Sequence, residues 1–409
     1  MNLVATAIFA AIILSGLLEI YLERRQLLCV AAHRDHVPAA FVGELTPEEH
    51  RRAADYTLAR TRLAMAQKAF AIVIAVLWLA VFLLPAYDLV AHFVMPGLSR
   101  SVALIVFVSA IGYVLDLPFT IIRTFRLEAE FGFNRTTPGM FLLDQLKGMA
   151  LQLALAVPLL YGFFALQHAI PNLWWLLGWA AFMVVMLAML IIYPAFIAPL
   201  FNKFTPMPDT PLKERIEALL AKCGFEAKGL YVMDASKRST HGNAYFSGFG
   251  KAKRIVFFDT LLQKQSEEEI LSILAHELGH YKFVHITQRI LEAAVLSFLA
   301  FAVLHWAFAG GLAKAFGMPD DPGLTLVIVL FAMAPIGHLL APFTNFLSRR
   351  AEFQADGFAK SMLGQEPMIS ALTKLSRDNL STLTPDWLYT LFYYSHPPVP
   401  ERIAHLHSA

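Results

Sequence analysis

The sequence predicts an all-α polytopic membrane protein with about seven transmembrane helices and a small α+β domain outside the bilayer. Of its 409 residues, 57% are hydrophobic and only 16% are charged, whereas soluble domains carry roughly 25% charged residues. The mean hydropathy is +0.56, which favours a bilayer as the main solvent. Seven apolar windows and a one-sided distribution of Lys and Arg are the other two observations that predict this fold class.

Each of the seven windows meets or approaches the roughly 20 apolar residues that a helix needs to cross a bilayer core. They are residues 3–22, 69–95, 102–122, 149–166, 173–201, 290–308 and 324–346. The first window lacks the basic start and the small-residue exit of a signal peptide, and it runs into Glu23, Arg24 and Arg25. We therefore expect it to be retained as an anchor.

The Lys and Arg residues between these windows lie almost entirely on one side of the predicted membrane, with 31 on that side and 2 on the other. Because cytoplasmic loops concentrate Lys and Arg, we expect the N-terminus outside and the C-terminus in the cytosol. The predicted organisation is residues 1–201 with five spans and cytosolic loops, 202–289 as a cytosolic segment, 290–346 as the last two spans, and 347–409 as a second cytosolic segment. The two cytosolic segments are expected to form one domain.

Composition excludes several other classes of protein. The net charge is only +2, and no block of about five or six basic residues supplies the charge that nucleic acid binding requires. The two cysteines, Cys29 and Cys223, are too few and too far apart for a disulfide scaffold or a cysteine metal cluster. No internal repeat supports a solenoid or an inverted-repeat transporter. A metal, if present, must be held by other residue types.

The first cytosolic segment contains patterns for both helices and strands. We expect a helix over residues 211–224, strands over 230–233 and 254–258, and a hairpin over 243–249 that turns through 250–252. Ser266 with Glu269 forms a capping box that begins a helix. Thr46 with Glu49, and Pro47 at the first helical position, forms another, which begins a helix leading into the second span.

The helix that begins at Ser266 carries the string His276-Glu277-Leu278-Gly279-His280. Residues four apart lie on one face of a helix, so both imidazoles can reach one Zn²⁺ while Glu277 projects beside the water that the metal activates. This is the HExxH arrangement of metalloproteases. The alternative interpretation is a pair of histidines on an exposed helix.

A third metal ligand has to come from elsewhere. The metzincin pattern requires Gly at position 283 and His at position 286, where this chain has Phe283 and Ile286, so that pattern is excluded. His285 lies nine residues after His276, about 180° around a continuous helix. We expect His285 to face away from the metal.

The other common solution is a carboxylate from a later helix. Glu352 follows the two last spans, which return the chain to the same side of the membrane, and we predict it as the third ligand. Asp356 lies one helical turn further on, where it can accept the free N–H of a ligand imidazole. The alternative for Asp356 is a solvated helix acid.

Beyond these residues, longer stretches resemble the integral-membrane zinc CAAX prenyl protease 1 family over nearly the whole chain. They are GFNRTT at 132–137, PLFNKFTPMPD at 199–209, STHGNAYFSGFG at 239–250, KRIVFFDTLL at 253–262, EEEILSILAHELGHYKFVH at 267–285, RRAEFQADGFA at 349–359 and YSHPPVPERIAHL at 394–406. The resemblance implies a ring of seven long helices around a large hydrated chamber, capped on the cytosolic side by the zinc domain.

The resemblance also assigns roles residue by residue. His276, His280 and Glu352 match the ligands of a single Zn²⁺, and Glu277 matches the catalytic glutamate. His396 is similar to a family histidine near the metal that can donate to the tetrahedral oxyanion.

Arg402 and the start of the predicted hairpin are candidate substrate-binding residues. Arg402 could orient the substrate backbone or a ligand carboxylate through its planar guanidinium group. Asn243 and Ala244 begin a candidate edge strand, with which an extended peptide could pair by strand addition. The alternative for these two residues is an ordinary hairpin.

We therefore expect a membrane-embedded zinc endopeptidase that cuts near the C-terminus of CaaX-type prenylated peptides or of other membrane-delivered peptides. Its expected partners are a peptide or lipidated protein substrate and membrane lipids, and not nucleic acid. Two alternatives remain open: a broad-specificity quality-control metalloprotease of the membrane, and a transporter or scaffold with a structural zinc. The bacterial inner membrane is the favoured location, or the endoplasmic reticulum membrane if the source is eukaryotic.

Overall fold

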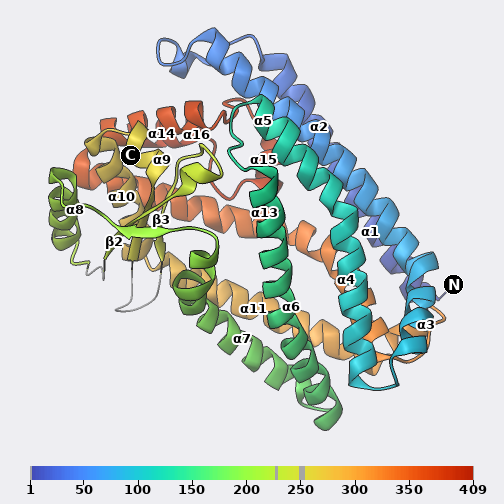
Figure 1. Ribbon diagram of the computed structural model, residues 1–409. Helices are drawn as coiled ribbons and strands as arrows, with labels where there is room; N and C mark the ends of the chain where they lie inside the picture. Colours follow the sequence, from blue (N-terminus) through green and yellow to red (C-terminus); the bar gives the residue numbers. More distant parts are fainter. Residues whose placement is uncertain (1, 226–228, 248–253, 409) are drawn as a thin grey trace.

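Seven long helices dominate the computed structural model, which describes residues 2–225, 229–247 and 254–408 (Figure 1). By length and composition, seven helices of the described chain can cross a membrane: Leu3–His33, Pro47–Phe93, Leu98–Glu130, Pro138–Ala169, Trp174–Leu200, His285–Ala309 and Pro322–Leu363. Each covers one of the predicted windows, so the predicted number of spans is confirmed. Several helices continue well beyond the apolar windows and so connect the bilayer region with the polar segments.

Some spans contain short π-helical or 3-10 segments and are subdivided accordingly. The helices of the membrane region are α1 (Leu3–His33), α2 (Pro47–Leu77), α3 (Leu83–Phe93), α4 (Leu98–Ile121), α5 (Glu128–Glu130), α6 (Pro138–Ala169), α7 (Trp174–Ile192), α11 (His285–Ala309), the short α12 (Leu312–Ala315) and α13 (Pro322–Leu363). The predicted start of α2 is confirmed, because Thr46 and Glu49 form a complete capping box with Pro47 in the first turn.

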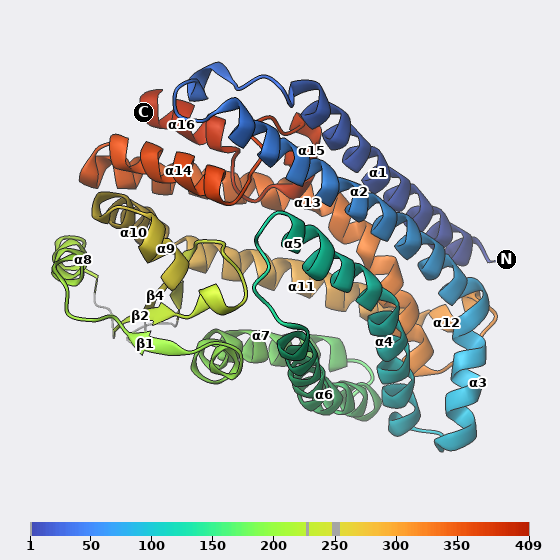
Figure 2. The ribbon, with the colours of Figure 1, turned by 45° about the horizontal axis from the view of Figure 1, so that its top comes forward.

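The spanning helices form a closed circuit (Figure 2). Around the circuit the contacts are α1 with α2 and α13, α13 with α11, α11 with α7, α7 with α6, α6 with α4, and α4 with α2, and α13 also contacts α4. Only 6% of the most apolar window is buried by protein in each of the spans formed by α6, α7 and α11. A helix inside a solid bundle buries a broad stripe of its surface. The low burial indicates that these helices border open space on the inner side of the circuit as well as lipid on the outer side.

A four-stranded sheet lies outside the membrane helices, with the strand order β1-β2-β4-β3. The strands are β1 (Phe204–Pro206), β2 (Leu230–Met233), β3 (Ala244–Ser247) and β4 (Arg254–Phe258). Strand β2 is parallel to β4, whereas β3 is antiparallel to β4 with Ala244 opposite Phe257. The strands predicted at 230–233 and 254–258 are confirmed, as is the pairing of β3 with β4, while the turn predicted at 250–252 lies outside the described residues.

Helices from both polar segments complete the part of the molecule that contains this sheet. They are α8 (Pro211–Lys222), α9 (Asp259–Lys264), α10 (Glu267–Lys282), α14 (Glu366–Asp378), α15 (Trp387–Tyr393) and α16 (Val399–Ser408). One hydrophobic core joins Phe257 of β4 and Leu274 of α10 with Ala371 of α14 and Leu406 of α16. Because α10 also contacts α13, the two helices predicted to carry metal ligands lie side by side.

Candidate metal centre

Helix α10 presents two imidazoles from adjacent turns. Its start is fixed by the predicted capping box, in which the Ser266 side chain and the Glu269 carboxylate each accept a backbone N–H. His276 and His280 are separated by one turn of α10, and their Nε2 atoms lie 3.2 Å apart. The His276 side chain is buried and that of His280 is half-buried. The period of the helix thus places two ring nitrogens at one point, as predicted.

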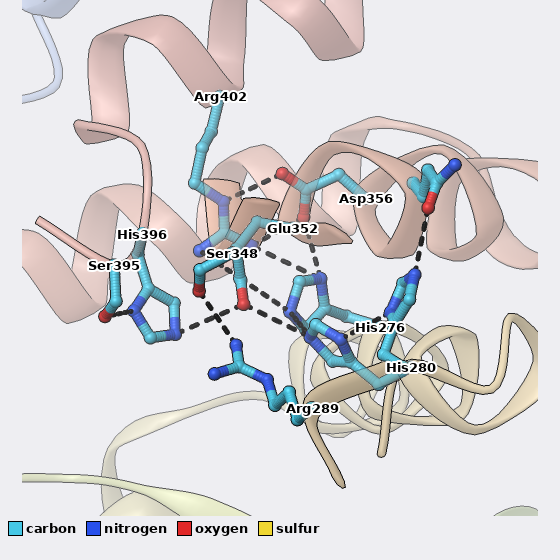
Figure 3. Close-up of polar contacts among 11 residues, drawn as sticks. His276, His280, Arg289, Ser348, Glu352, Asp356, Ser395, His396 and Arg402 are labelled. Atoms are coloured by element: carbon cyan, nitrogen blue, oxygen red, sulfur yellow. Dashed lines mark hydrogen bonds and ion pairs between the residues drawn. The ribbon is translucent and has the colours of Figure 1, made fainter. Parts of the chain in front are cut away.

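Helix α13 brings the predicted carboxylate to the same point. Glu352 Oε2 lies 3.3 Å from His276 Nε2, and Glu352 Oε1 lies 3.3 Å from His280 Nε2 (Figure 3). The ligand atoms of these three residues all lie within 4.8 Å of one another. Glu352 Oε2 is buried and makes no hydrogen bond within the described chain. A buried carboxylate whose two oxygens each face a ring nitrogen, one of them without a hydrogen bond, supplies with these nitrogens a set of donors that fits a divalent metal ion.

A buried carboxylate and guanidinium hold His276 from behind. Asp356 Oδ1 lies 2.8 Å from His276 Nδ1, and Arg402 donates from Nε to Asp356 Oδ2 at 2.8 Å and from Nη2 to Oδ1 at 2.5 Å. With Nδ1–H donating to Asp356, the lone pair of Nε2 points toward Glu352. Burial lowers the pKa of His276, but the hydrogen bonds to Asp356 and Glu352 outweigh it and raise the pKa to about 9. The hydrogen bond from Nδ1–H to Asp356 is compatible with metal binding at Nε2 and makes the ring more basic.

The prediction that His285 faces away from the site is wrong. His285 is only 2% exposed, its Nδ1 lies 2.9 Å from His280 Nδ1, and its Nε2 lies 2.9 Å from Gln354 Oε1. The prediction assumed a continuous helix, whereas α10 ends at Lys282 and α11 begins at His285 after Val284, whose backbone is left-handed with φ 53°. Left-handed conformation is rare for a β-branched residue, so nothing in the sequence marked the break.

These contacts determine which ring nitrogen of His280 and of His285 carries the hydrogen. Gln354 Oε1 can only accept, so His285 donates from Nε2 and its Nδ1 accepts the Nδ1–H of His280. The Nε2 of His280 is then left with its lone pair toward Glu352. Both ligand imidazoles are therefore held in the tautomer that binds a metal through Nε2.

A cavity of about 500 Å³ opens in front of this group and contains the predicted catalytic glutamate. It is lined by Glu277, His280, Glu352 and His396, and by Tyr245 and Phe246 of β3. Burial raises the pKa of the half-buried Glu277, an effect that the neighbouring His276 and His280 oppose. Glu277 thus lies beside the candidate metal ligands with its pKa raised above the ordinary value of a glutamate.

The structure also brings His396 to the centre. Its Nε2 lies 3.3 Å from Glu352 Oε1, and 62% of its side chain is exposed. The Ser395 Oγ lies 2.9 Å from His396 Nδ1. If the Ser395 hydroxyl donates to Nδ1, His396 carries its hydrogen on Nε2, the atom that lies beside Glu352 Oε1.

Asn243 and Ala244 lie at the edge of the sheet rather than in the cavity. Within the described chain β3 pairs with β4 alone, so its other edge is open. Ala244 is buried, and Asn243 accepts the Ala244 N–H through its own Oδ1 at 2.8 Å. The next two residues of the strand, Tyr245 and Phe246, line the cavity. The strand is therefore next to the candidate metal ligands, and the substrate-binding roles of Asn243 and Ala244 stay predictions.

Seven spanning helices with an HExxH helix, a distant glutamate and a base in one cavity define a membrane metallopeptidase. Comparison with known families agrees: residues 26–203 match the family model described as "CAAX prenyl protease N-terminal, five membrane helices", and residues 206–409 match peptidase family M48. The chain belongs to the CAAX prenyl protease 1 family and is a metalloendopeptidase.

Individual relatives match over nearly their full length. The chain is 36% identical to a CAAX prenyl protease 1 homolog of Oryza sativa, over 98% of this chain and 97% of that protein. It is 33% identical to CAAX prenyl protease 1 of Saccharomyces cerevisiae, over 95% and 92% of the two chains. The crystal structure of S. mikatae Ste24p superposes with a TM-score of 0.92 at 28% identity, covering 99% of both chains. The predicted family, fold class and enzyme class are confirmed.

Proposed function

We propose that this enzyme hydrolyses peptide bonds near the C-terminus of CaaX-type prenylated peptides or of other peptides delivered by the membrane. The observation that supports the proposal is that one cavity joins Glu277 and His396 with two of the three candidate metal ligands and an edge strand. The relatives named above carry the description of CAAX prenyl proteases. The substrate class is inferred from them.

One Zn²⁺ held by His276, His280 and Glu352 is part of this proposal. Two imidazoles and one carboxylate form a ligand set that leaves a fourth position open, as catalytic zinc sites require. When bound there, Zn²⁺ would act as a Lewis acid on water and on the scissile carbonyl. An open fourth position favours a catalytic zinc over a structural zinc in a scaffold or transporter.

The side chains of the enzyme would carry the proton transfers. Glu277 would take the proton of the attacking water and pass it to the leaving amine, and burial, which raises the pKa of its carboxyl, makes it a stronger base for the first of these transfers. His396 would donate its Nε2–H to the oxygen that becomes negative in the transition state, which is worth about 2.7–4 kcal/mol in comparable sites. The open edge of β3 would hold the peptide extended across the cavity.

We also propose that the protease domain faces the cytosol. The distribution of 31 Lys and Arg residues on the side of the polar segments against 2 on the other side supports this orientation. Lipidated C-termini on cytosolic proteins would then reach the cavity from the membrane surface.

Turnover of paired peptides tests the proposed function. The full chain in detergent or liposomes is given a farnesylated CaaX peptide and its unmodified counterpart, with and without a chelator. We expect faster cleavage of the farnesylated peptide, loss of cleavage with chelator and recovery on adding Zn²⁺. Glu352→Ala, which removes a ligand, should lower the zinc content and serves as the control without metal.

Other outcomes would point elsewhere. Equal cleavage of farnesylated, unmodified and unrelated peptides would favour the quality-control protease. Zinc bound at one per chain without hydrolysis of any peptide would favour a structural zinc. Near-stoichiometric zinc in Glu352→Ala would show that the third ligand is a different residue.

A further inference from the structure

The cavity in front of the candidate metal ligands carries one Arg or Lys side chain among the described residues that line it. This is Arg289, in the second turn of α11. Its Nη2 donates to Ser348 Oγ at 2.8 Å (Figure 3). Among the described residues no carboxylate forms an ion pair with Arg289, so its positive charge meets only a neutral hydroxyl. A guanidinium group exposed in a cavity with only a neutral partner is ready to bind an anion.

The contact of Arg289 with Ser348 on α13 gives its approximate distance from the candidate metal ligands. Ser348 precedes Glu352 by four residues on α13, which corresponds to a rise of about 6 Å. An extended peptide advances about 3.3 Å per residue, so a group two or three residues beyond the scissile bond lies roughly 7–10 Å from it. The flexible side chain of Arg289 can cover the few ångströms between the rise of about 6 Å along α13 and the roughly 7–10 Å that the peptide spans.

The same cavity also has apolar side chains in its lining. Phe225, Phe246, Val284 and Ile286 line it together with Arg289. These side chains suit aliphatic residues of a peptide, whereas the single guanidinium suits a negative charge. Apolar side chains and one guanidinium group in the same cavity match a short aliphatic peptide end with a free carboxylate.

A second cavity, of about 430 Å³, continues on the far side of Arg289. The two cavities share His285 and Arg289. The lining of the second is polar and includes a further cation and one acid; it comprises Gln288, Glu292, Leu347, Ser348, Arg350, Ala351 and Gln354. A carboxylate bound to Arg289 would therefore lie at the entrance of a polar space rather than against an apolar wall.

We propose that Arg289 binds the α-carboxylate of the substrate's C-terminus, two or three residues beyond the scissile bond. This inference rests on the proposed function and narrows it, because it makes the enzyme selective for peptides that end in a free acid near the cut. A guanidinium group and a carboxylate form two parallel hydrogen bonds, and a charged hydrogen bond is worth about 10- to 100-fold in binding. A quality-control protease that cuts inside long chains would have no use for such a contact.

Two peptides that differ only in their last atoms test the proposal. One is a farnesylated CaaX peptide with a C-terminal carboxylate, and the other is the same peptide with a C-terminal carboxamide. For the zinc-loaded wild type we expect kcat/KM to be about 10- to 100-fold higher for the acid. Arg289→Gln should lower kcat/KM for the acid to the level of the amide and leave the amide unchanged, and Arg289→Lys should retain part of the preference.

Lys282 supplies a matched control. It is an exposed cation at the end of α10, two residues after His280, and lines neither cavity. Lys282→Gln should leave the ratio of acid to amide unchanged, which separates a specific contact from the general effect of positive charge. The zinc content of every variant is measured as well, because Arg289→Gln should retain its metal.

The outcomes separate this inference from the function on which it rests. Equal and chelator-sensitive cleavage of acid and amide by the wild type would overturn the role of Arg289 and leave the protease function intact. An acid preference that persists in Arg289→Gln, or loss of zinc from that variant, would also overturn it. No cleavage of either peptide by the zinc-loaded wild type would overturn the proposed function itself.

Discussion

The two imidazoles at the candidate metal centre are held by different means. The Nδ1–H of His276 donates to Asp356, which forms an ion pair with Arg402. The Nδ1–H of His280 instead donates to the neutral His285, which in turn donates to Gln354. A carboxylate partner makes a ring more basic than a neutral one does. We therefore expect the two ligands to contribute unequally, with His276 the stronger.

Glu277 is the residue whose removal should separate hydrolysis from metal binding. Glu277→Gln keeps the size of the side chain and all three candidate ligands but removes the proton acceptor. We expect kcat to fall by roughly 10²–10⁴-fold while the zinc content, measured by atomic absorption, stays at the wild-type level. Full turnover in this variant would contradict the role assigned to Glu277.

The neutral chain behind His280 leads to a prediction about metal affinity. His285→Leu or Gln354→Leu should weaken zinc binding about 10- to 100-fold, the usual effect of losing an outer hydrogen bond to a ligand, as measured by competition with a chelator. Gln354→Glu retains an acceptor for His285 and should retain or strengthen zinc binding. If all three variants bound zinc as tightly as the wild type, His285 would have no role in holding His280 for the metal.

The residues of this site differ in how far the sequence could predict them. His276, Glu277 and His280 follow from helical periodicity, and Glu352 follows from the need for a carboxylate on the same side of the membrane. His285 could not be placed, because its position depends on one left-handed residue, Val284. Arg289 could not be selected either, since only the packing of α11 against α13 shows that it lines the cavity.

At the scale of single elements, the predicted helix starts were accurate because capping is local chemistry. Glu269 completes the capping box of α10 through the Ser266 N–H at 2.7 Å. The same carboxylate also accepts from Lys374 on α14 at 2.7 Å and from Ser370 at 2.5 Å, and it is only 4% exposed. The capping box could be predicted from the sequence. The contacts with α14 could not, because they join residues about a hundred positions apart.

Because Glu269 joins two helices, its loss should destabilise the domain more than the loss of its capping partner. Glu269→Gln should lower the thermal unfolding temperature further than Ser266→Ala, which costs about 1 kcal/mol as a lost cap. Burial raises the pKa of Glu269, but Lys374 and Ser370 outweigh it, so that the pKa lies below its ordinary value of 4.5. A depressed pKa stabilises the folded state above that value, and the contribution is lost as the pH falls through the folded pKa.

Unfolding of both variants at neutral pH and near pH 4 checks this expectation. The difference between the wild type and Glu269→Gln should be largest at neutral pH and should shrink on acidification. A difference that is constant with pH would mean that the charge of Glu269 contributes nothing.

At the scale of the whole molecule, hydropathy predicted how many helices cross the membrane but not which helices are neighbours. The closed circuit of helices depends on contacts such as that of α13 with both α1 and α11, and apolar windows carry no information about partners. The chamber was implied by the family resemblance alone. The low burial of α6, α7 and α11 is the observation in the structure that agrees with it.

Contacts between distant segments gather the basic connections at one end of the molecule. Four of these contacts are Arg25 with Asp386 at 2.8 Å, Tyr56 with Glu128 at 2.7 Å, Arg238 with Asp144 at 2.9 Å and Lys374 with Glu269 at 2.7 Å. They link all four Lys- and Arg-rich segments, which follow the first, third, fifth and seventh spans. Since seven spans place the two chain ends on opposite sides, one wrongly assigned span would have separated these partners.

The orientation of the whole molecule can be tested with single cysteines in living cells. Cys29 and Cys223 are first replaced by Ser, and Lys314→Cys or Ser408→Cys is then introduced, one exposed site at each end of the molecule. With 31 Lys and Arg residues on the side of the protease domain, the positive-inside rule requires that side to be cytosolic. A membrane-impermeant maleimide should therefore label position 314 in intact cells and position 408 only after permeabilisation. The reverse pattern would put the cavity outside the cytosol, where cytosolic lipidated C-termini could not reach Glu277 or Arg289, although the chemistry of the metal ligands would be unaffected.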